Sequence, residues 1–344
     1  MYIADMHCDT IMLIWLARRE GRALNLRDTA GSGEELQIDL LKLKEGGSLV
    51  QNFAIYVDLM KEHGVEPWTQ FTEMAQIYHS EIAANADLVR EARSYEDIIR
   101  NRDDGLISSI MTIEEGGVLG GDLDRLRTVY DEGVRMITLT WNYENELGFP
   151  NPLPPGMDED YTRYFRFEPQ TSDNGLKAWG FEALEVMDDL GIIADVSHLS
   201  DAGFYDVAKA ARGPFVASHS NCRALCGCNR NMTDDMIRLT GEKGGVIGLN
   251  FCPEFIMEAE SEMACKSTIE GLARHARRMI NVGGREVVGI GTDYDGIGRD
   301  DLAVPKASGM QKLAEGFEAQ GFTADEIEGI CYKNVMRVYK EVLK

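Results

Sequence analysis

The chain contains no apolar run approaching the roughly 18 residues that a membrane-spanning helix needs, although 44% of its 344 residues are hydrophobic. Its N-terminal stretch also lacks a basic segment followed by an apolar one, so we expect no secretory signal. Acidic residues outnumber basic ones: the chain has 58 Asp and Glu but only 35 Lys and Arg, which gives a net charge of −23. This balance disfavours binding to nucleic acid or to an anionic membrane. We therefore expect a globular cytoplasmic protein with neither kind of partner.

Cysteines are few and odd in number, with seven in the chain. An odd count without an export signal indicates reduced thiols rather than a disulfide framework. Three of them, Cys222, Cys226 and Cys228, form a C-x3-C-x-C pattern. That spacing matches no common zinc or iron–sulfur site, so we interpret them as buried or incidental thiols.

A dinucleotide-binding GxGxxG motif is absent after the first strand-like segment, which argues against an open doubly wound sheet, the second architecture considered. Eight short apolar segments instead alternate with helical stretches along the whole chain. They cover residues 2–4, 48–56, 106–113, 135–140, 191–196, 214–218, 245–250 and 286–291. This alternation predicts parallel β/α units, and eight units predict a TIM-type (β/α)8 barrel, an α/β fold that forms a single domain over residues 1–344. A long loop near 142–174 holds five of the nine prolines, and we expect it to line a site.

Histidine is scarce, with six residues, yet three of these stand at the C-terminal ends of predicted strands. In such barrels the active site is built on that face from the ends of several strands. Carboxylates occupy equivalent positions there, so six metal-type side chains are expected to converge: His7, Asp9, Glu114, His198, His219 and Asp293. Taken singly, each could be a hydrogen-bonded loop or core residue. Together, mixed N/O ligands favour Zn²⁺ over Mn²⁺ or Fe²⁺, and a shared carboxylate favours a two-metal hydrolase.

Seven short segments contain or adjoin these candidate residues. In chain order they are DMHCDT (5–10), TIEEGG (112–117), ITLTWN (137–142), DVSHLS (195–200), ASHSNCRAL (217–225), NRNMTDD (229–235) and GTDYDG (291–296). They span the chain from one end to the other, and together they resemble the membrane (renal) dipeptidase family, a binuclear-metal branch of the amidohydrolase superfamily. The resemblance implies a TIM barrel and a zinc-dependent dipeptidase.

The resemblance also implies roles for individual residues. His7 and Asp9 would bind one zinc ion, His198 and His219 the other, and Glu114 would bridge them. Glu115 also precedes the glycine pair, so the sequence leaves the choice of bridging residue open. Asp293 matches the catalytic acid/base, which accepts a proton from a metal-bridging hydroxide and delivers it to the leaving amine.

The resemblance also bears on the residues that would bind substrate. Arg230 matches the residue that grips the C-terminal carboxylate of the substrate, a task that suits a guanidinium. Trp141 stands where mammalian members have a histidine, so we expect altered specificity, with Asn142 or Asn145 supplying a hydrogen-bond donor. Cys252 replaces a tyrosine of the mammalian pattern in the substrate pocket.

We therefore predict a metallo-dipeptidase that holds two zinc ions and hydrolyses L-Xaa–L/D-Xaa dipeptides; the family adds the expectation of a homodimer. A different amidohydrolase, such as a lactonase or a deacylase, is the first competing interpretation. Many of those enzymes bridge their metals with a carboxylated lysine on the fourth strand, and the segment RMITLT offers no lysine. A catalytically impaired metal-binding regulator is the second competing interpretation.

Overall fold

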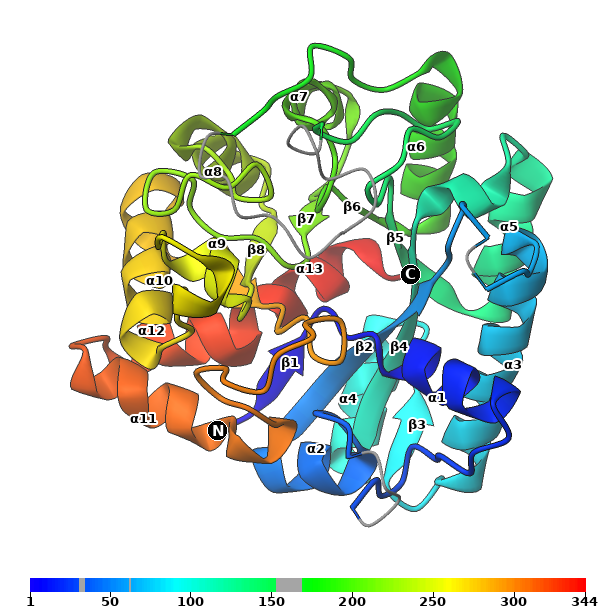
Figure 1. Cartoon of the computed structure of the whole chain (residues 1–344), viewed down its shortest axis with the longest axis horizontal. Helices are drawn as coiled ribbons and strands as arrows, with labels where there is room; N and C mark the ends of the chain where they lie inside the picture. The colour runs from blue at the N-terminus through cyan, green and yellow to red at the C-terminus, as the bar shows by residue number, and fades with distance from the viewer. Residues whose placement is uncertain (31–34, 62, 153–168) are drawn as a thin grey trace.

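Parallel strands form the centre of the molecule, and helices surround them (Figure 1). The computed structural model describes residues 1–30, 35–61, 63–152 and 169–344. Over these residues the strands are β1 (Ile3–Asp5), β2 (Ser48–Tyr56), β3 (Val89–Glu91), β4 (Ile107–Glu114), β5 (Val134–Thr138), β6 (Ile193–Asp195), β7 (Val216–Ala217), β8 (Val246–Leu249) and β9 (Val288–Ile290). Pairing of β2 with both β1 and β4, and of β1 with β9, closes eight strands into a barrel. The predicted TIM-type barrel is confirmed.

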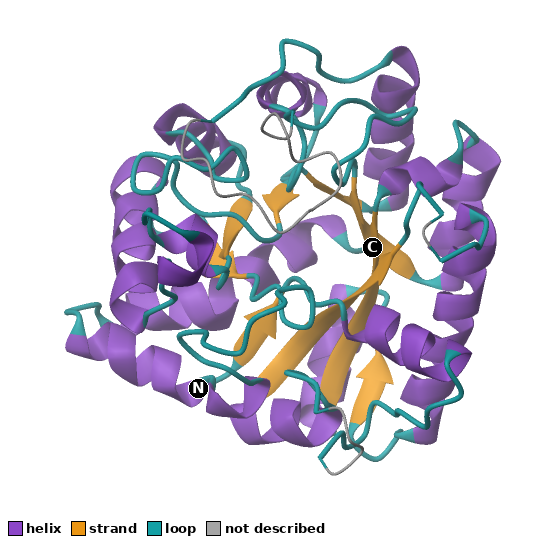
Figure 2. Cartoon of the chain, viewed as in Figure 1, coloured by secondary structure: helices purple, strands orange, loops and turns teal. Residues whose placement is uncertain are grey.

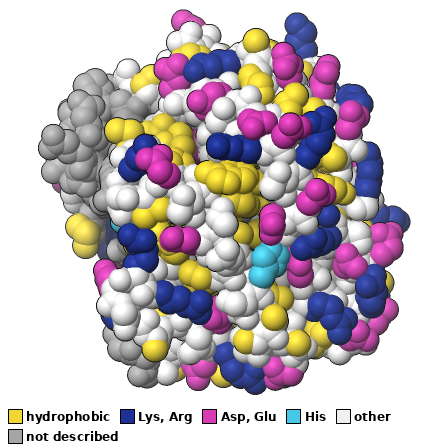
Figure 3. All heavy atoms as spheres, turned by 90° about the vertical axis from the view of Figure 1, so that its right-hand side faces the viewer, with side chains coloured by type: hydrophobic (Ala, Val, Ile, Leu, Met, Phe, Trp, Pro, Cys, Tyr) yellow, Lys and Arg dark blue, Asp and Glu magenta, His cyan; other side chains and the backbone are white. Residues whose placement is uncertain are grey.

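The helices pack around this barrel as an outer layer (Figure 2). They are α1 (Thr10–Arg19), α2 (Leu40–Gly46), α3 (Pro67–Ala84), α4 (Tyr95–Asp103), α5 (Leu123–Glu132), α6 (Ala178–Leu190), α7 (Asp201–Ala210), α8 (Asp234–Glu242), α9 (Pro253–Ile256), α10 (Ile269–Gly283), α11 (Gln311–Ala319), α12 (Ala324–Glu328) and α13 (Asn334–Val342). None of the helices in the described ranges is long and apolar enough to span a membrane. On the face in Figure 3, acidic and basic side chains are interspersed.

Two buried clusters fill the space on either side of the strands. The larger one lies mainly between the barrel and the outer helices. The smaller one joins strand residues such as Val50 and Val246 to Val335 and Tyr339 of α13. The Tyr339 hydroxyl donates a hydrogen bond to Asn52 Oδ1 at 2.9 Å. Helix α13, which lies behind the strands in Figure 1, therefore anchors the barrel away from the site described below.

Local sequence explains most element boundaries. The run SLVQNFAIY, rich in β-branched and aromatic residues, forms β2 over its full predicted length. The Thr233 side chain accepts a hydrogen bond from Met236 N and so caps α8. Gly191 ends α6 with a φ of 80°, a conformation that glycine adopts without steric cost.

The residue pattern predicts helices over 262–282 and 323–342 and one amphipathic stretch over 67–93, and the structure differs from all three predictions. The amphipathic stretch 67–93 divides into α3 and the short strand β3, which pairs only with the beginning of β4 and is too short to show a period of two. The helix predicted over 262–282 begins as α10 at Ile269, because Thr268 provides its cap. The helix predicted over 323–342 is interrupted by a π-helical turn at Gly329–Lys333. In the loop 142–174, residues 153–168 lie outside the described residues; no helix or strand is assigned in the remainder.

Candidate metal centre and active site

Residues at the ends of five strands meet at the C-terminal face of the barrel. His7 and Asp9 follow β1, Glu114 ends β4, and His198, His219 and Asp293 follow β6, β7 and β9, respectively. Within the described residues, three groups of potential metal ligands form here: His7–Asp9–Glu114, Glu114–His198–His219 and His7–His219–Asp293. The structure thus brings all six sequence-predicted residues together.

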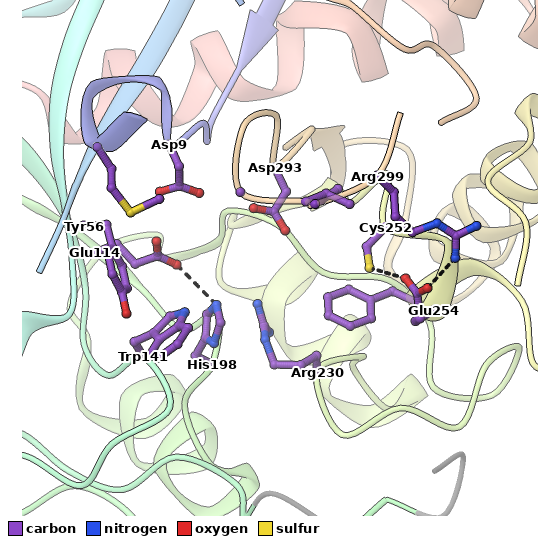
Figure 4. A pocket seen from close by; sticks show the side chains of 15 residues that line it. Asp9, Tyr56, Glu114, Trp141, His198, Arg230, Cys252, Glu254, Asp293 and Arg299 are labelled. Atoms are coloured by element: carbon purple, nitrogen blue, oxygen red, sulfur yellow. Dashed lines mark hydrogen bonds and ion pairs between the residues drawn. The ribbon is translucent and has the colours of Figure 1, made fainter. Parts of the chain in front are cut away.

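Glu114 lies at the centre of this cluster. Its Oε2 is 3.4 Å from His7 Nε2, while its Oε1 is 3.3 Å from His198 Nε2 and 3.7 Å from His219 Nε2. Figure 4 shows the carboxylate between Asp9 and His198. The two oxygens therefore face different histidines, the arrangement needed to bridge two ions.

Glu115 faces away from the histidines and serves a different purpose. Its φ of 80° turns the chain at the end of β4. Its carboxylate accepts hydrogen bonds from Gly117 N at 2.7 Å, from Trp141 N at 2.9 Å and from Asn145 Nδ2 at 2.5 Å. Of the two adjacent glutamates, only Glu114 is therefore placed to bridge, and Glu115 organises the loop after β5.

Hydrogen bonds fix the orientation of two imidazoles. His198 Nδ1 is 3.0 Å from Asn142 Oδ1, and His219 Nδ1 is 2.7 Å from Ser218 Oγ. The Ser218 hydroxyl donates to Asp195 Oδ2 at 2.6 Å, so its oxygen is left to accept from His219. Both Nδ1 atoms then carry protons, and both Nε2 atoms present lone pairs to the cluster.

This donor set fits a cation. The two Nε2 atoms are 3.0 Å apart and both lie near a carboxylate oxygen. In addition, Asp9 Oδ1 and both ring nitrogens of His7 are buried without a hydrogen-bond partner among the described residues. Electron-rich atoms gathered in a buried site are costly unless a cation binds them. Imidazole and carboxylate ligands together suit a divalent transition metal.

Burial and crowding shift the titration of these groups in the metal-free protein. Burial, together with the nearby Asp9 and Asp293, raises the pKa of Glu114 to about 8, against the opposing effect of His7. Burial alone would lower the pKa of His7, but Glu114 and Asp9 outweigh it and hold that pKa well above its usual value. For His198 and His219, burial first and then the positive charges of Arg230 and His7 lower the pKa well below the usual value.

These shifts predict how stability depends on pH. From neutral pH up to about pH 8, folded Glu114 still binds a proton that the unfolded chain has released, and the raised pKa of His7 acts in the same direction, so a rise in pH favours unfolding. We expect the thermal midpoint of chelator-treated protein to fall over this range. Added zinc should counter the fall, because metal binding requires deprotonated ligands.

Differential scanning fluorimetry with EDTA and with zinc would measure both trends. Glu114→Gln, which cannot ionise, should flatten the decline of the chelated protein. A midpoint that rises with pH after chelation would contradict the predicted protonation of this cluster.

Asp293 lies beside the other candidate metal ligands, and one of its two carboxylate oxygens is available to exchange a proton. Its Oδ2 accepts a hydrogen bond from Asn250 Nδ2 at 3.0 Å, which leaves Oδ1 to face the cluster. Burial is the largest of the effects that raise the pKa of Asp293 to about 6. A carboxyl group with this pKa can both accept and release a proton near neutral pH.

A cavity of about 360 Å³ opens above this cluster. Asp9, Glu114, His198 and Asp293 contribute to its metal-facing side. Figure 4 places Tyr56 and Trp141 at one end of the cavity and Glu254 and Arg299 at the other, with Arg230 between them. The lining residues are Asp9, Met12, Tyr56, Glu114, Trp141, His198, Arg230, Cys252, Glu254, Phe255, Asp293, Gly296, Ile297, Gly298 and Arg299.

Arg230 places a buried positive charge in this cavity. The residue is 7% exposed, and its guanidinium lies 5.5 Å from the Phe255 ring centroid. Among the described residues, its Nε has no hydrogen-bond partner and no acidic group lies within ion-pair distance of it. The chain has 58 acidic residues, yet none of those described pairs with Arg230. Because a buried charge without a partner is costly, this arrangement favours binding of an anion.

The two remaining residues predicted to bind substrate, Trp141 and Asn142, have different positions. Trp141 lines the cavity, and its ring packs edge-on against Tyr56 with centroids 5.0 Å apart. Asn142 is not among the lining residues, and its carboxamide contacts His198 instead. A direct contact of Asn142 with substrate stays a prediction.

Sequence reasoning missed part of the cavity wall. The Cys252 thiol donates to Glu254 Oε2 at 2.9 Å, and Glu254 Oε1 binds Arg299 Nη1 at 2.7 Å. Only Cys252 was expected there. Tyr56 was missed as well, although its place at the end of β2 was a usable signal. The cysteines at 222, 226 and 228 are buried and free, as expected, and none belongs to the ligand groups found among the described residues.

The model of the membrane dipeptidase family (peptidase family M19) matches residues 1–344. This chain belongs to that family. It is therefore a metallo-dipeptidase, a hydrolase that acts on peptide bonds. The predicted family and enzyme class are confirmed.

Two relatives show how far the similarity extends along the chain. An uncharacterised protein encoded in the pqqA 5′ region of Klebsiella pneumoniae is 32% identical over 275 residues, which cover 80% of this chain and 95% of that protein. Dipeptidase 3 of Rattus norvegicus is 30% identical over 236 residues, or 69% of this chain and 45% of that protein.

A solved metallopeptidase of Rhodobacter sphaeroides, liganded with a phosphinate mimic of L-Ala-D-Ala, shares the fold. Its TM-score is 0.84 at 24% identity, with 100% of this chain and 99% of that chain covered. The solved dipeptidase AC gives a TM-score of 0.85, also at 24% identity, and covers the same shares.

Proposed function

We propose that this dipeptidase holds two zinc ions and cleaves L-Xaa–L/D-Xaa dipeptides that carry a free C-terminal carboxylate. The proposed substrate class rests on the environment of Arg230. Its guanidinium is buried, has no acidic partner among the described residues and lies at the edge of the cluster of candidate metal ligands. A carboxylate is the ligand that a guanidinium binds most specifically. The Rhodobacter sphaeroides relative, with its mimic of L-Ala-D-Ala, supports acceptance of a D residue at the C-terminal position.

The metal ligands in this proposal are His7 and Asp9 for one ion, His198 and His219 for the other, and Glu114 for both. Two of the ligand groups share Glu114 in this way. Two zinc ions bound there would supply a bridging hydroxide as the nucleophile and polarise the scissile carbonyl.

The chain's own residues would perform the remaining steps. Arg230 binds the C-terminal carboxylate and so fixes the peptide bond over the cluster. Asp293 accepts the nucleophile's proton at Oδ1 and passes it to the leaving amine nitrogen. Trp141 and Tyr56 form an apolar wall that restricts water and contacts the substrate.

Kinetics on a matched panel of dipeptides would test this proposal. We expect turnover of L,L and L,D dipeptides but little of D,L dipeptides, with metal analysis giving two zinc ions per chain. Chelation should abolish activity, and zinc should restore it. Two bound ions without turnover of any dipeptide would favour the impaired regulator and contradict the proposal.

A lactonase or a deacylase has weaker support than a dipeptidase. A lactone has no free carboxylate for Arg230 to bind, and a deacylase would use Arg230 only for acylated substrates that keep a carboxylate. Equal cleavage of C-terminally amidated dipeptides would favour a broader amidohydrolase. A cytoplasmic location and a homodimer remain predictions from sequence.

A further inference from the structure

The two candidate ion positions differ in how the protein supports their ligands. Both include Glu114, but one adds His7 and Asp9 and the other adds His198 and His219. Hydrogen bonds to the outer side of a metal ligand fix its orientation and raise its basicity. Such support can therefore make two neighbouring ion positions unequal.

The His198–His219 position is supported on both imidazoles. Asn142 Oδ1 accepts from His198 Nδ1, and Ser218 Oγ accepts from His219 Nδ1. Asp195 extends the second interaction, because its carboxylate accepts hydrogen bonds from the Ser218 hydroxyl and from Thr138 Oγ1, both at 2.6 Å. Both rings are therefore held with Nε2 facing the cluster before any ion binds.

The His7–Asp9 position has less support of this kind. His7 is 1% exposed, and Asp9, which lines the cavity, is 4% exposed. His7 Nδ1 and Asp9 Oδ1 nevertheless have no hydrogen-bond partner among the described residues. Within that part of the chain, no hydrogen bond to Nδ1 fixes the tautomer or the rotation of the His7 ring. An ion that binds here must therefore order its own ligands.

We propose that the two positions bind zinc with unequal affinity, the His198–His219 position being the tighter one, and that Asn142 is a positioning residue for His198. This inference rests on the two-metal proposal above. Loss of an outer hydrogen bond to a metal ligand weakens metal binding by about 10- to 100-fold. We expect a difference of at least about tenfold between the two positions on the same grounds.

Stepwise addition of zinc to metal-free protein, in competition with a chromophoric chelator, would measure both affinities. The parent protein should show two separate binding events. Asp9→Ala should keep the tighter event and weaken or lose the other one, whereas His219→Ala should lose the tighter event. Equal affinities in the parent, or loss of the tighter event in Asp9→Ala, would overturn the inference.

Variants of Asn142 test its positioning role. Asn142→Ala should weaken the tighter event about 10- to 100-fold and leave the weaker event unchanged. Asn142→Asp keeps an acceptor for His198 Nδ1 and should restore tight binding. Glu144→Gln is the matched control, because Glu144 lies in the same loop but pairs with Lys177. An Asn142→Ala protein that binds both ions as the parent does would remove Asn142 from this role.

The outcomes also separate this inference from the proposed function. A protein that binds two zinc ions equally and hydrolyses dipeptides would refute only the inequality. A protein that binds no zinc, or a single ion, would refute the two-metal proposal itself.

Discussion

Asp293→Asn is expected to lower kcat by about 10²–10⁴-fold, the usual range for loss of a general acid or base. An asparagine can keep the hydrogen bond with Asn250, so the loop should retain its conformation. It cannot take up or deliver a proton at this position. Steady-state kinetics would show the loss in kcat rather than in KM, because binding of the substrate carboxylate is unaffected.

Metal analysis of the same variant decides what Asp293 does. Unchanged metal content with low kcat is the result expected for a proton carrier. Loss of metal would identify Asp293 as a ligand, since it also belongs to a potential ligand group with His7 and His219. Asp300→Asn, an exposed position in the same loop, is the matched control and should behave as the parent.

Arg230→Ala is expected to lower kcat/KM by about 10- to 100-fold, chiefly through KM. A hydrogen bond to a charged group contributes roughly 1.5–3 kcal/mol, and each 1.4 kcal/mol corresponds to about a tenfold change. Arg230→Lys keeps the positive charge but loses the paired geometry, so an intermediate effect is expected.

Amidated substrates make this test specific. The parent should prefer a dipeptide with a free carboxylate over its C-terminal amide, and Arg230→Ala should lose that preference. Arg238→Ala serves as a control, because Arg238 is paired with Asp235 at the surface. If the parent cleaves the amide and the free acid equally well, Arg230 does not bind a substrate carboxylate.

The barrel and its ligand residues could be predicted because the relevant signals are local. Each strand is an apolar segment, and each ligand stands at or just after the end of one, as with Glu114, the last residue of β4. The strand β3 was missed because three residues carry no readable alternation. Sequence periodicity likewise could not place the break between α12 and α13, where the chain changes only its hydrogen-bond pattern.

The surroundings of the ligands depend on contacts that the sequence does not display. Asn142 and His198 are 56 positions apart, and the Glu254–Arg299 pair joins α9 to a loop residue 45 positions later. Neither pair has a spacing that indicates contact. The choice between Glu114 and Glu115 also needed the structure, because Glu115 turns away from the strand with a left-handed backbone that the sequence does not display.

The left-handed backbone at the ends of the strands has a consequence for protein engineering. His198, Asp293 and Asp295 have φ values of 69°, 61° and 65°, in a region that costs most residues about 1–2 kcal/mol and that glycine enters freely. A search for stabilising substitutions, if guided by melting temperature alone, would therefore favour glycine at these positions and remove the side chains of His198 and Asp293, which are predicted to function in the active site. Thermostability and catalysis compete in these loops, so selection for a more robust enzyme should hold these positions fixed and seek its gains in the outer helices.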